Sequence, residues 1–169
     1  MRSIVTAPAA ILSATAKPIE DFATPWLYDL VADMARIRRA MGGAGIAAPQ
    51  VGEGVRLFLL DAAQRDGTVL SRHAGIERLV VANPCIIRHE GQPVTGAEGC
   101  LSIPSTLVPG GRIDVHRSPR IVWRGSSLTG SAIGGTLDGF AARAFQHEVD
   151  HLDGILITDH IVAGPERQP

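Results

Sequence analysis

The chain has 169 residues and a formal net charge of −1, and hydrophobic residues make up 45% of it. This length suits one domain with its own core, so residues 1–169 are expected to form a single domain. Basic residues are spread along the chain and no apolar run is long enough for a membrane span, so neither a nucleic-acid surface nor membrane insertion is expected.

A first helix is predicted from Thr24-Pro25 to Gly42-Gly43. Thr24 offers a capping hydroxyl, Pro25 suits the first turn, and a glycine pair ends the helix. Between these signals, apolar residues recur at helical spacing, namely Leu27, Leu30, Val31, Met34, Ile37 and Met41. The arginines Arg36, Arg38 and Arg39 are expected to form a solvated face of this helix.

Apolar runs at 55–60 and 79–82 predict strands, with a polar turn region at 64–67 between them. A further strand pair is expected at 113–115 and 121–123. A C-terminal helix ending near Gly154 then carries an apolar stripe of Leu137, Phe140, Ala141, Ala144, Phe145 and Leu152. This order predicts an α+β fold with mixed, mostly antiparallel sheets packed around the C-terminal helix.

The C-terminal helix contains an HExxH pattern within Gln146-His147-Glu148-Val149-Asp150-His151. Residues at positions i and i+4 share one face of a helix, so His147 and His151 can bind one metal ion. Glu148 lies beside that position, where a general base for a water molecule is needed. A solvated helical face is the plainer alternative.

A catalytic metal site of this kind needs a third protein ligand. Downstream, Ile157 stands where a metzincin would have its third histidine, and Glu166 lies in a proline-containing tail. Upstream, Cys100 follows a glycine in a Glu-Gly-Cys-Leu-Ser segment and can complete a site of one cysteine and two histidines. A buried structural thiol is an equal alternative for Cys100, and Cys85 is expected to be an ordinary core or strand-end residue.

The chemistry of these residues predicts a divalent ion held by Cys100, His147 and His151. Attack on a carbonyl would then need donors for the developing oxyanion, and a side-chain amide such as Gln50 and a backbone N–H such as that of Leu101 can serve. A hydrogen bond that stabilises the loop is an equal alternative for Gln50.

A glycine-rich segment, Gly43-Ala44-Gly45-Ile46-Ala47-Ala48-Pro49-Gln50-Val51-Gly52, precedes these motifs. It does not fit a phosphate-binding loop, because no Lys-Ser/Thr follows and the GxGxxG spacing fails at Ala48. Its GxGxAAxQ pattern, together with EGCLS and QHExDH in that order, resembles the peptide deformylase family. The three patterns extend from Gly43 to His151.

The resemblance implies an enzyme that removes the N-formyl group from the N-terminal methionine of new polypeptides and releases formate. It implies ferrous iron as the native ion, with zinc or nickel as substitutes, Glu148 as general acid/base, and Gln50 and the Leu101 amide facing the oxyanion. Gly45, next to Ala44, would pair with an extended substrate, and Arg143 and Ala144 would lie near the methionine pocket. An ion pair between Glu98 and Arg117 would support the cysteine segment, the alternative being two unrelated surface charges.

Two departures from the family pattern bear on substrate and partners. The segment 105–112 looks longer than usual and would border the cleft, which leaves a different N-acyl or amide substrate as a rival. A structural metal site on a binding module is a second rival, disfavoured by the presence of Gln50 and Glu148. The chain ends soon after His151 without the basic C-terminal helix of many bacterial relatives, so ribosome docking through such a helix cannot be assumed, and transient ribosome contact stays an open alternative. The expected partners are N-formylmethionyl nascent peptides, and a thiolate ligand favours a cytoplasmic location.

Overall fold

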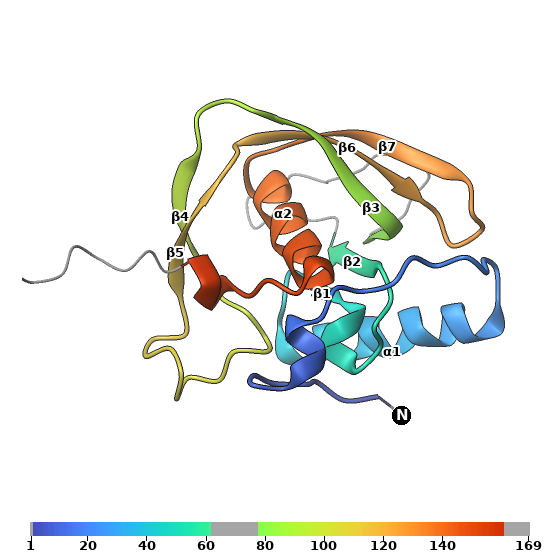
Figure 1. Ribbon diagram of the computed structural model, residues 1–169, viewed down its shortest axis with the longest axis horizontal. Coiled ribbons are helices and arrows are strands. Elements are labelled where there is room, and N and C mark those ends of the chain that lie inside the picture. Colours follow the sequence, from blue (N-terminus) through green and yellow to red (C-terminus); the bar gives the residue numbers. More distant parts are fainter. Residues whose placement is uncertain (1, 62–77, 161–169) are drawn as a thin grey trace, which may run out of the picture.

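Two antiparallel sheets and two α-helices are found in residues 2–61 and 78–160, which the computed structural model describes (Figure 1). Three short 3-10 helices are also present: η1 Ala10–Ser13, η2 Ala48–Val51 and η3 Ile157–His160. The larger elements are α1 Pro25–Met41, β1 Gly45–Ala47, β2 Leu57–Asp61, β3 Arg78–Glu90, β4 Val94–Glu98, β5 Ile113–Arg117, β6 Arg120–Ser126, β7 Ala132–Asp138 and α2 Gly139–Asp153.

The larger sheet has the strand order β1-β2-β3-β6-β7, and β4 pairs with β5 in the smaller one. Every pairing within the two described sheets is antiparallel, and a parallel bridge joins Lys17 to Val55. In Figure 1, α2 lies between the larger sheet and the β4–β5 pair. The predicted α+β class, with mostly antiparallel sheets around the C-terminal helix, is therefore confirmed.

The expected strand pair at 113–115 and 121–123 is wrong, although both strands exist. β5 pairs with β4, whereas β6 lies between β3 and β7. The reason is burial in different cores: Val115 packs with Leu12 and Leu156, while Ile121 packs with Phe58 and Phe145. The chain therefore changes sheets between β5 and β6 instead of forming a hairpin.

The two α-helices pack on opposite faces of the larger sheet, and the side chains of β2 contact both. Because side chains alternate along a strand, Leu57 and Leu59 pack against the α1 side, and Phe58 and Leu60 pack against the α2 side. All four are fully buried, which explains the unbroken apolar run in the sequence. On the α2 side, the Phe145 ring lies 4.9 Å from the Phe58 ring and thereby joins helix to sheet.

The predicted first helix is confirmed, and the predicted residues cap both of its ends. The Thr24 hydroxyl accepts a hydrogen bond from the Leu27 N–H at 3.3 Å, and Gly42 ends the helix in the left-handed conformation, with φ 69°. The expected solvated arginine face is wrong at one position. Arg36 and Arg39 are exposed, but Arg38 is buried beneath the glycine-rich segment that follows.

The C-terminal helix α2 begins at Gly139 and ends at Gly154, which adopts φ 77°. Leu137, assigned to its apolar stripe from the sequence, lies in β7 instead, and Phe140 is exposed. Cys85 is also exposed rather than in the core. The turn region expected at 64–67 lies outside the described residues. Neither described helix combines the length and the apolar character that a membrane crossing requires.

Candidate metal centre

His147 and His151 lie one turn apart on α2, at the edge of the face that the helix buries. Ala141, Phe145 and Leu152 anchor that face in the core beneath the larger sheet. The two imidazole rings are 4.9 Å apart between centroids. Anchoring of the helix therefore fixes both histidines relative to each other, as the HExxH spacing predicts.

The cysteine segment brings a thiol to the two histidines. Cys100 Sγ lies 3.3 Å from His151 Nε2, and donor atoms of Cys100, His147 and His151 all lie within 4.8 Å of one another. Donors around one tetrahedral ion would be roughly 3.3–3.8 Å apart, since metal–ligand distances are about 2.0–2.3 Å. The separation of Cys100 and His151 matches this range, and the fold brings together the three residues that the sequence predicts as ligands.

The protonation of the two imidazoles also fits a cation at this position. Burial, together with His147 and Arg117, holds the pKa of His151 well below its usual value, which leaves a neutral imidazole able to ligate. Burial alone would lower the pKa of His147, but Cys100, Glu98 and Glu148 raise it to about 10. Cys100, Glu98 and Glu148 therefore favour positive charge at His147, where a metal ion would supply it.

Glu148 is buried beside the cluster, with an exposed fraction of 3%. Its Oε2 has no hydrogen-bond partner among the described residues. Burial raises the pKa of Glu148 against an opposing effect of His147, and with smaller contributions from Glu98 and Asp150 the pKa is about 7. A carboxyl group with this pKa can both accept and return a proton near neutral pH.

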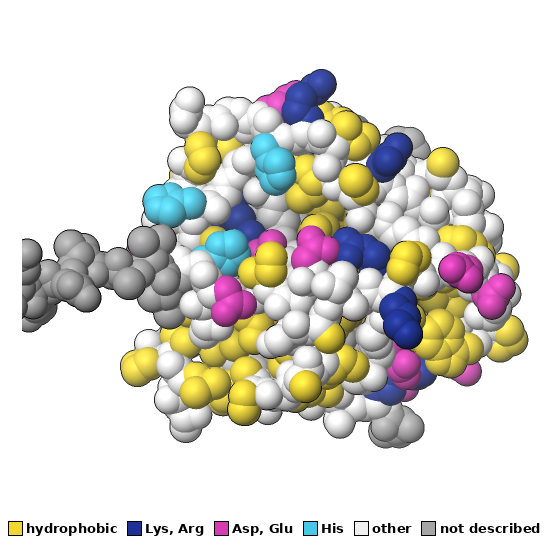
Figure 2. Space-filling model, viewed as in Figure 1, with side chains coloured by type: hydrophobic (Ala, Val, Ile, Leu, Met, Phe, Trp, Pro, Cys, Tyr) yellow, Lys and Arg dark blue, Asp and Glu magenta, His cyan; other side chains and the backbone are white. Residues whose placement is uncertain are grey.

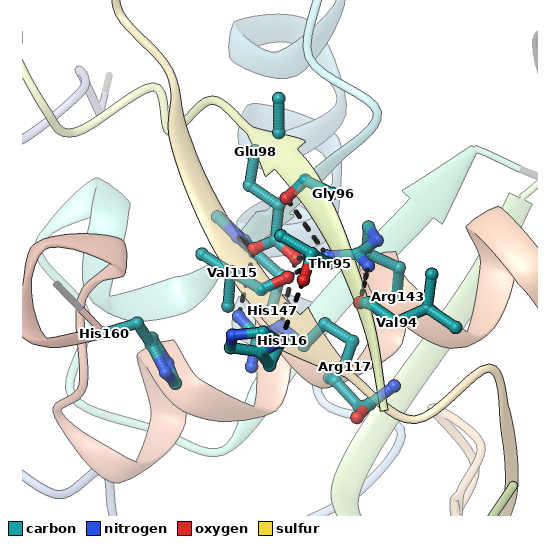
Figure 3. A network of polar contacts seen from close by, with 12 residues as sticks. Val94, Thr95, Gly96, Glu98, Val115, His116, Arg117, Arg143, His147 and His160 are labelled. Atoms are coloured by element: carbon teal, nitrogen blue, oxygen red, sulfur yellow. Dashed lines mark hydrogen bonds and ion pairs between the residues drawn. The ribbon is translucent and has the colours of Figure 1, made fainter. Parts of the chain in front are cut away.

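Glu98, at the end of β4, contacts the imidazole of His147 (Figure 3). His147 Nδ1 lies 3.0 Å from Glu98 Oε2, so a ring that donates its Nδ1–H to this carboxylate would bind a metal ion through Nε2. Arg117 donates to both oxygens of Glu98 at 3.0 Å, and Arg143 donates to Oε1 at 2.8 Å. Burial alone would raise the pKa of Glu98, but the bonds from His147 and Arg117 lower it to about 2.

The ion pair expected between Glu98 and Arg117 is therefore present and buried, and two unrelated surface charges are excluded. Arg117 also donates to Asp150 Oδ2 at 2.6 Å, and the same oxygen lies 2.8 Å from His160 Nε2. Sequence reasoning missed the contributions of Asp150 and His160. The position of Asp150 inside the QHExDH pattern, directly before His151, was the available signal.

Gln50 lies in η2 with an exposed fraction of 2%. Its Oε1 accepts from the Ala47 N–H at 2.9 Å, and its Nε2 donates to Ser102 Oγ at 3.1 Å and lies 3.7 Å from Cys100 Sγ. The amide thus stabilises its loop and also presents its donor end to the cluster, so both alternatives for Gln50 have support. Leu101 follows Cys100 directly, and its side chain contacts Gly43.

The four residues expected to contact substrate lie in two places. Ala44 precedes β1 and Gly45 begins it, and β1 is an edge strand of the larger sheet. Gly45 lies against Glu148 so closely that a Cβ there would overlap the carboxylate. On α2, Ala144 is half-buried against the core, whereas the Arg143 guanidinium donates to the carbonyls of β4 and β5 residues Val94, Gly96 and Val115.

Charged and histidine side chains gather on the face formed by β4, β5 and α2, as Figure 2 shows. An α+β fold that presents a thiol, two imidazoles and a buried carboxyl group to one point defines a hydrolase with a candidate metal centre.

Comparison with known proteins agrees with this class. The model of the polypeptide deformylase family matches residues 1–166. The peptide deformylase of Desulforudis audaxviator is 37% identical over 156 residues, which are 92% of this chain and 90% of that protein. The chain therefore belongs to the polypeptide deformylase family.

Two solved structures show the same fold. The crystal structure of the peptide deformylase from Thermotoga maritima gives a TM-score of 0.81 at 33% identity, covering 96% of this chain and 98% of that one. A class I type b peptide deformylase from Acinetobacter baumannii, solved with Met-Ala-Ser bound, gives a TM-score of 0.83 at 30% identity, covering 95% and 98%.

Proposed function

We propose that this chain removes the N-formyl group from the N-terminal methionine of new polypeptides and releases formate, the activity of its family. The observation that carries the proposal is the cluster of Cys100, His147 and His151 beside the buried carboxyl group of Glu148. One thiolate and two imidazoles form a ligand set for one divalent ion with a position left open. We propose Fe2+ as the native ion, with Zn2+ and Ni2+ as substitutes.

The three ligand side chains would hold the ion, whose Lewis acidity would activate a water molecule and polarise the formyl carbonyl. Glu148 accepts the proton of the attacking water and returns it to the leaving nitrogen, and its pKa near 7 suits both steps. The formyl C–N bond then breaks, giving formate and a free amino terminus.

Negative charge develops on the carbonyl oxygen during attack, and preorganised donors stabilise it. Gln50 Nε2 and the Leu101 N–H are the proposed donors. The Gln50 amide cannot turn freely, because its Oε1 is held by the Ala47 N–H at 2.9 Å. Loss of one such donor would reduce turnover about 10²–10³-fold.

The substrate would lie in an extended conformation along the β1 edge at Ala44 and Gly45, with its methionine near Arg143 and Ala144. Because the Arg143 guanidinium is engaged with Glu98 and backbone carbonyls, only its aliphatic stem is proposed to contact the methionine. Nascent N-formylmethionyl peptides are the proposed partners, and the cytoplasm is the proposed location. Ribosome contact is no part of the proposal.

The test compares formate release from formyl-Met-Ala-Ser and from its acetyl analogue by anaerobically iron-loaded protein. Glu148→Gln is expected to lower turnover by about 10²–10⁴-fold with metal content retained, because the proton acceptor is lost. Asp153→Asn is the matched control, since Asp153 is an exposed acid on the same helix. Release from the acetyl analogue alone would instead support the rival N-acyl substrate, and equal release by Glu148→Gln would refute the assigned role.

A further inference from the structure

Arg38 is a buried charged residue that the candidate metal centre does not explain. It lies in the last turn of α1 with an exposed fraction of 7%, while its neighbour Arg39 is exposed. Burial of a guanidinium is unfavourable unless its charge and its N–H groups find partners. The partners of Arg38 therefore indicate what it does.

Arg38 Nη1 donates to the Gly43 carbonyl at 2.7 Å and forms an ion pair with Asp61 Oδ2 at 2.8 Å. The main chain adds two bonds to the same unit. The Gly43 N–H donates to the Arg38 carbonyl at 3.1 Å, and the Asp61 N–H donates to the Ala44 carbonyl at 2.8 Å. Arg38 thus joins the end of α1, the glycine-rich segment and the end of β2.

The segment that Arg38 holds leads directly into the edge strand β1. Glycines at 42, 43 and 45 give this stretch a large conformational freedom, which must be restricted before the segment can present a defined edge. Neighbouring side chains also limit the position of this segment on the side that faces the candidate metal centre. A Cβ on Gly43 would lie 2.8 Å from Leu101 Cδ1, and Gly45 lies against Glu148.

We infer that Arg38 is a positioning residue, which fixes the β1 edge for pairing with the extended substrate by holding the Gly43 carbonyl and Asp61. The inference rests on the proposed function, because the edge matters only if a peptide pairs with it. Peptide addition to a strand edge depends on the placement of main-chain donors and acceptors. Loss of Arg38 should therefore weaken peptide binding more than it slows the chemical step.

The test uses the iron-loaded full chain with Arg38→Met, which keeps an unbranched apolar stem and removes the guanidinium. Arg39→Met is the matched control from the next position on the helix. For formyl-Met-Ala-Ser, Arg38→Met should raise KM about tenfold, equivalent to about 1.4 kcal/mol, with a smaller change in kcat. Binding of the product peptide Met-Ala-Ser should weaken by a similar factor, and Arg39→Met should match the wild type in both.

Amide hydrogen exchange of residues 43–47 and of Asp61 gives a readout that does not depend on turnover. It should be faster in Arg38→Met than in Arg39→Met. If Arg38→Met does not fold, Asp61→Asn replaces it in the test. This variant removes the ion pair with Arg38 and keeps the hydrogen bond from Arg38 to Gly43. A rise in KM and faster exchange of residues 43–47 are then expected.

Equal KM and equal exchange in Arg38→Met and Arg39→Met would overturn the inference. If Asp61→Asn has to be used instead, wild-type KM and wild-type exchange of residues 43–47 in this variant would overturn it. Should the wild type release no formate, the proposed function fails. The exchange comparison would then still decide whether Arg38 fixes the segment.

Discussion

Gly45 is the point at which the main chain of β1 meets the carboxyl group of Glu148. A Cβ at this position would overlap Glu148 Oε1 and lie 2.6 Å from Leu60 Cδ2. Glycine is thus required by close approach, and its φ lies outside the left-handed region. The proposed proton acceptor and the proposed substrate edge therefore meet in one contact.

Gly45→Ala is expected to fold but to displace either Glu148 or the β1 edge. Because a displacement of about 1 Å at a reacting group can cost roughly 10²-fold in rate, formate release should fall by about that factor. Gly54→Ala is the control, since a Cβ at Gly54 would meet nothing within 4 Å. Wild-type turnover by a folded Gly45→Ala protein would contradict the packing described for Glu148.

The two cysteines offer a direct test of the ligand set. Cys100 lies 3.3 Å from His151 Nε2, whereas Cys85 is exposed on β3. Protein loaded with Co2+ should show thiolate-to-metal absorption that Cys100→Ser removes and Cys85→Ser keeps, because cobalt accepts the same donors as zinc. Loss of the absorption in Cys85→Ser alone would show that the wrong cysteine has been assigned.

At the scale of elements, both α-helices end at a left-handed glycine, but the space around the two glycines differs. A Cβ at Gly42 would meet nothing within 4 Å, while one at Gly154 would lie 2.8 Å from the carbonyl carbon and oxygen of Ser13. The C-terminal end of α2, one turn beyond His151, is therefore packed closely against Ser13, whereas Gly42 at the end of α1 has open space around it.

Gly42→Ala should destabilise the protein by about 1 kcal/mol, the backbone strain alone. Gly154→Ala adds the clash with Ser13 and should cost roughly 2–4 kcal/mol. Urea unfolding of the two variants gives the comparison. Equal losses of unfolding free energy in the two variants would show that the close contact between Gly154 and Ser13 adds no cost.

The helices and the catalytic pattern were predictable because their signals are local. Thr24, Pro25 and Gly42 mark the limits of α1, and the spacing of His147 and His151 requires only a helix. Strand partners were not predictable in this way, because pairing depends on residues distant in the chain. β7 also escaped prediction, since AIGGTLD contains two glycines and few strand-favouring residues.

Burial of Arg38 was equally beyond the sequence. Arg38 occupies the same arginine cluster as Arg36 and Arg39, and its composition does not distinguish it from them. Arg38 is buried because later parts of the chain, at Gly43 and Asp61, fold against its side chain. The Arg143 contacts with β4 and β5 arise in the same way, from a sheet whose pairing the sequence left open.

For the whole molecule, Glu98 connects the smaller sheet to α2 through Arg117, Arg143 and His147. We propose on this ground that residues 1–169 form one domain, unfolding in a single transition. Loss of the Glu98 charge should then lower the stability of the whole domain.

The pKa of Glu98 is about 2 in the folded protein against 4.5 ordinarily. Because this pKa is lowered by folding, the charge contributes stability that is complete above about pH 4.5 and is lost as the pH falls toward 2. In chelator-treated protein, Glu98→Gln should cost on the order of 3 kcal/mol at pH 6 and progressively less at lower pH. Glu90→Gln, which alters exposed ion pairs, should change stability little. A Glu98→Gln cost that stays constant from pH 6 to pH 2.5 would contradict the lowered pKa.

The measurement that tests the account most directly is formate release from formyl-Met-Ala-Ser as Fe2+ is titrated anaerobically into metal-free protein. We expect no release without metal, a linear rise, and saturation at one ion per chain, because Cys100, His147 and His151 form one candidate ligand set. Release without metal, or silence at full occupancy, would contradict it.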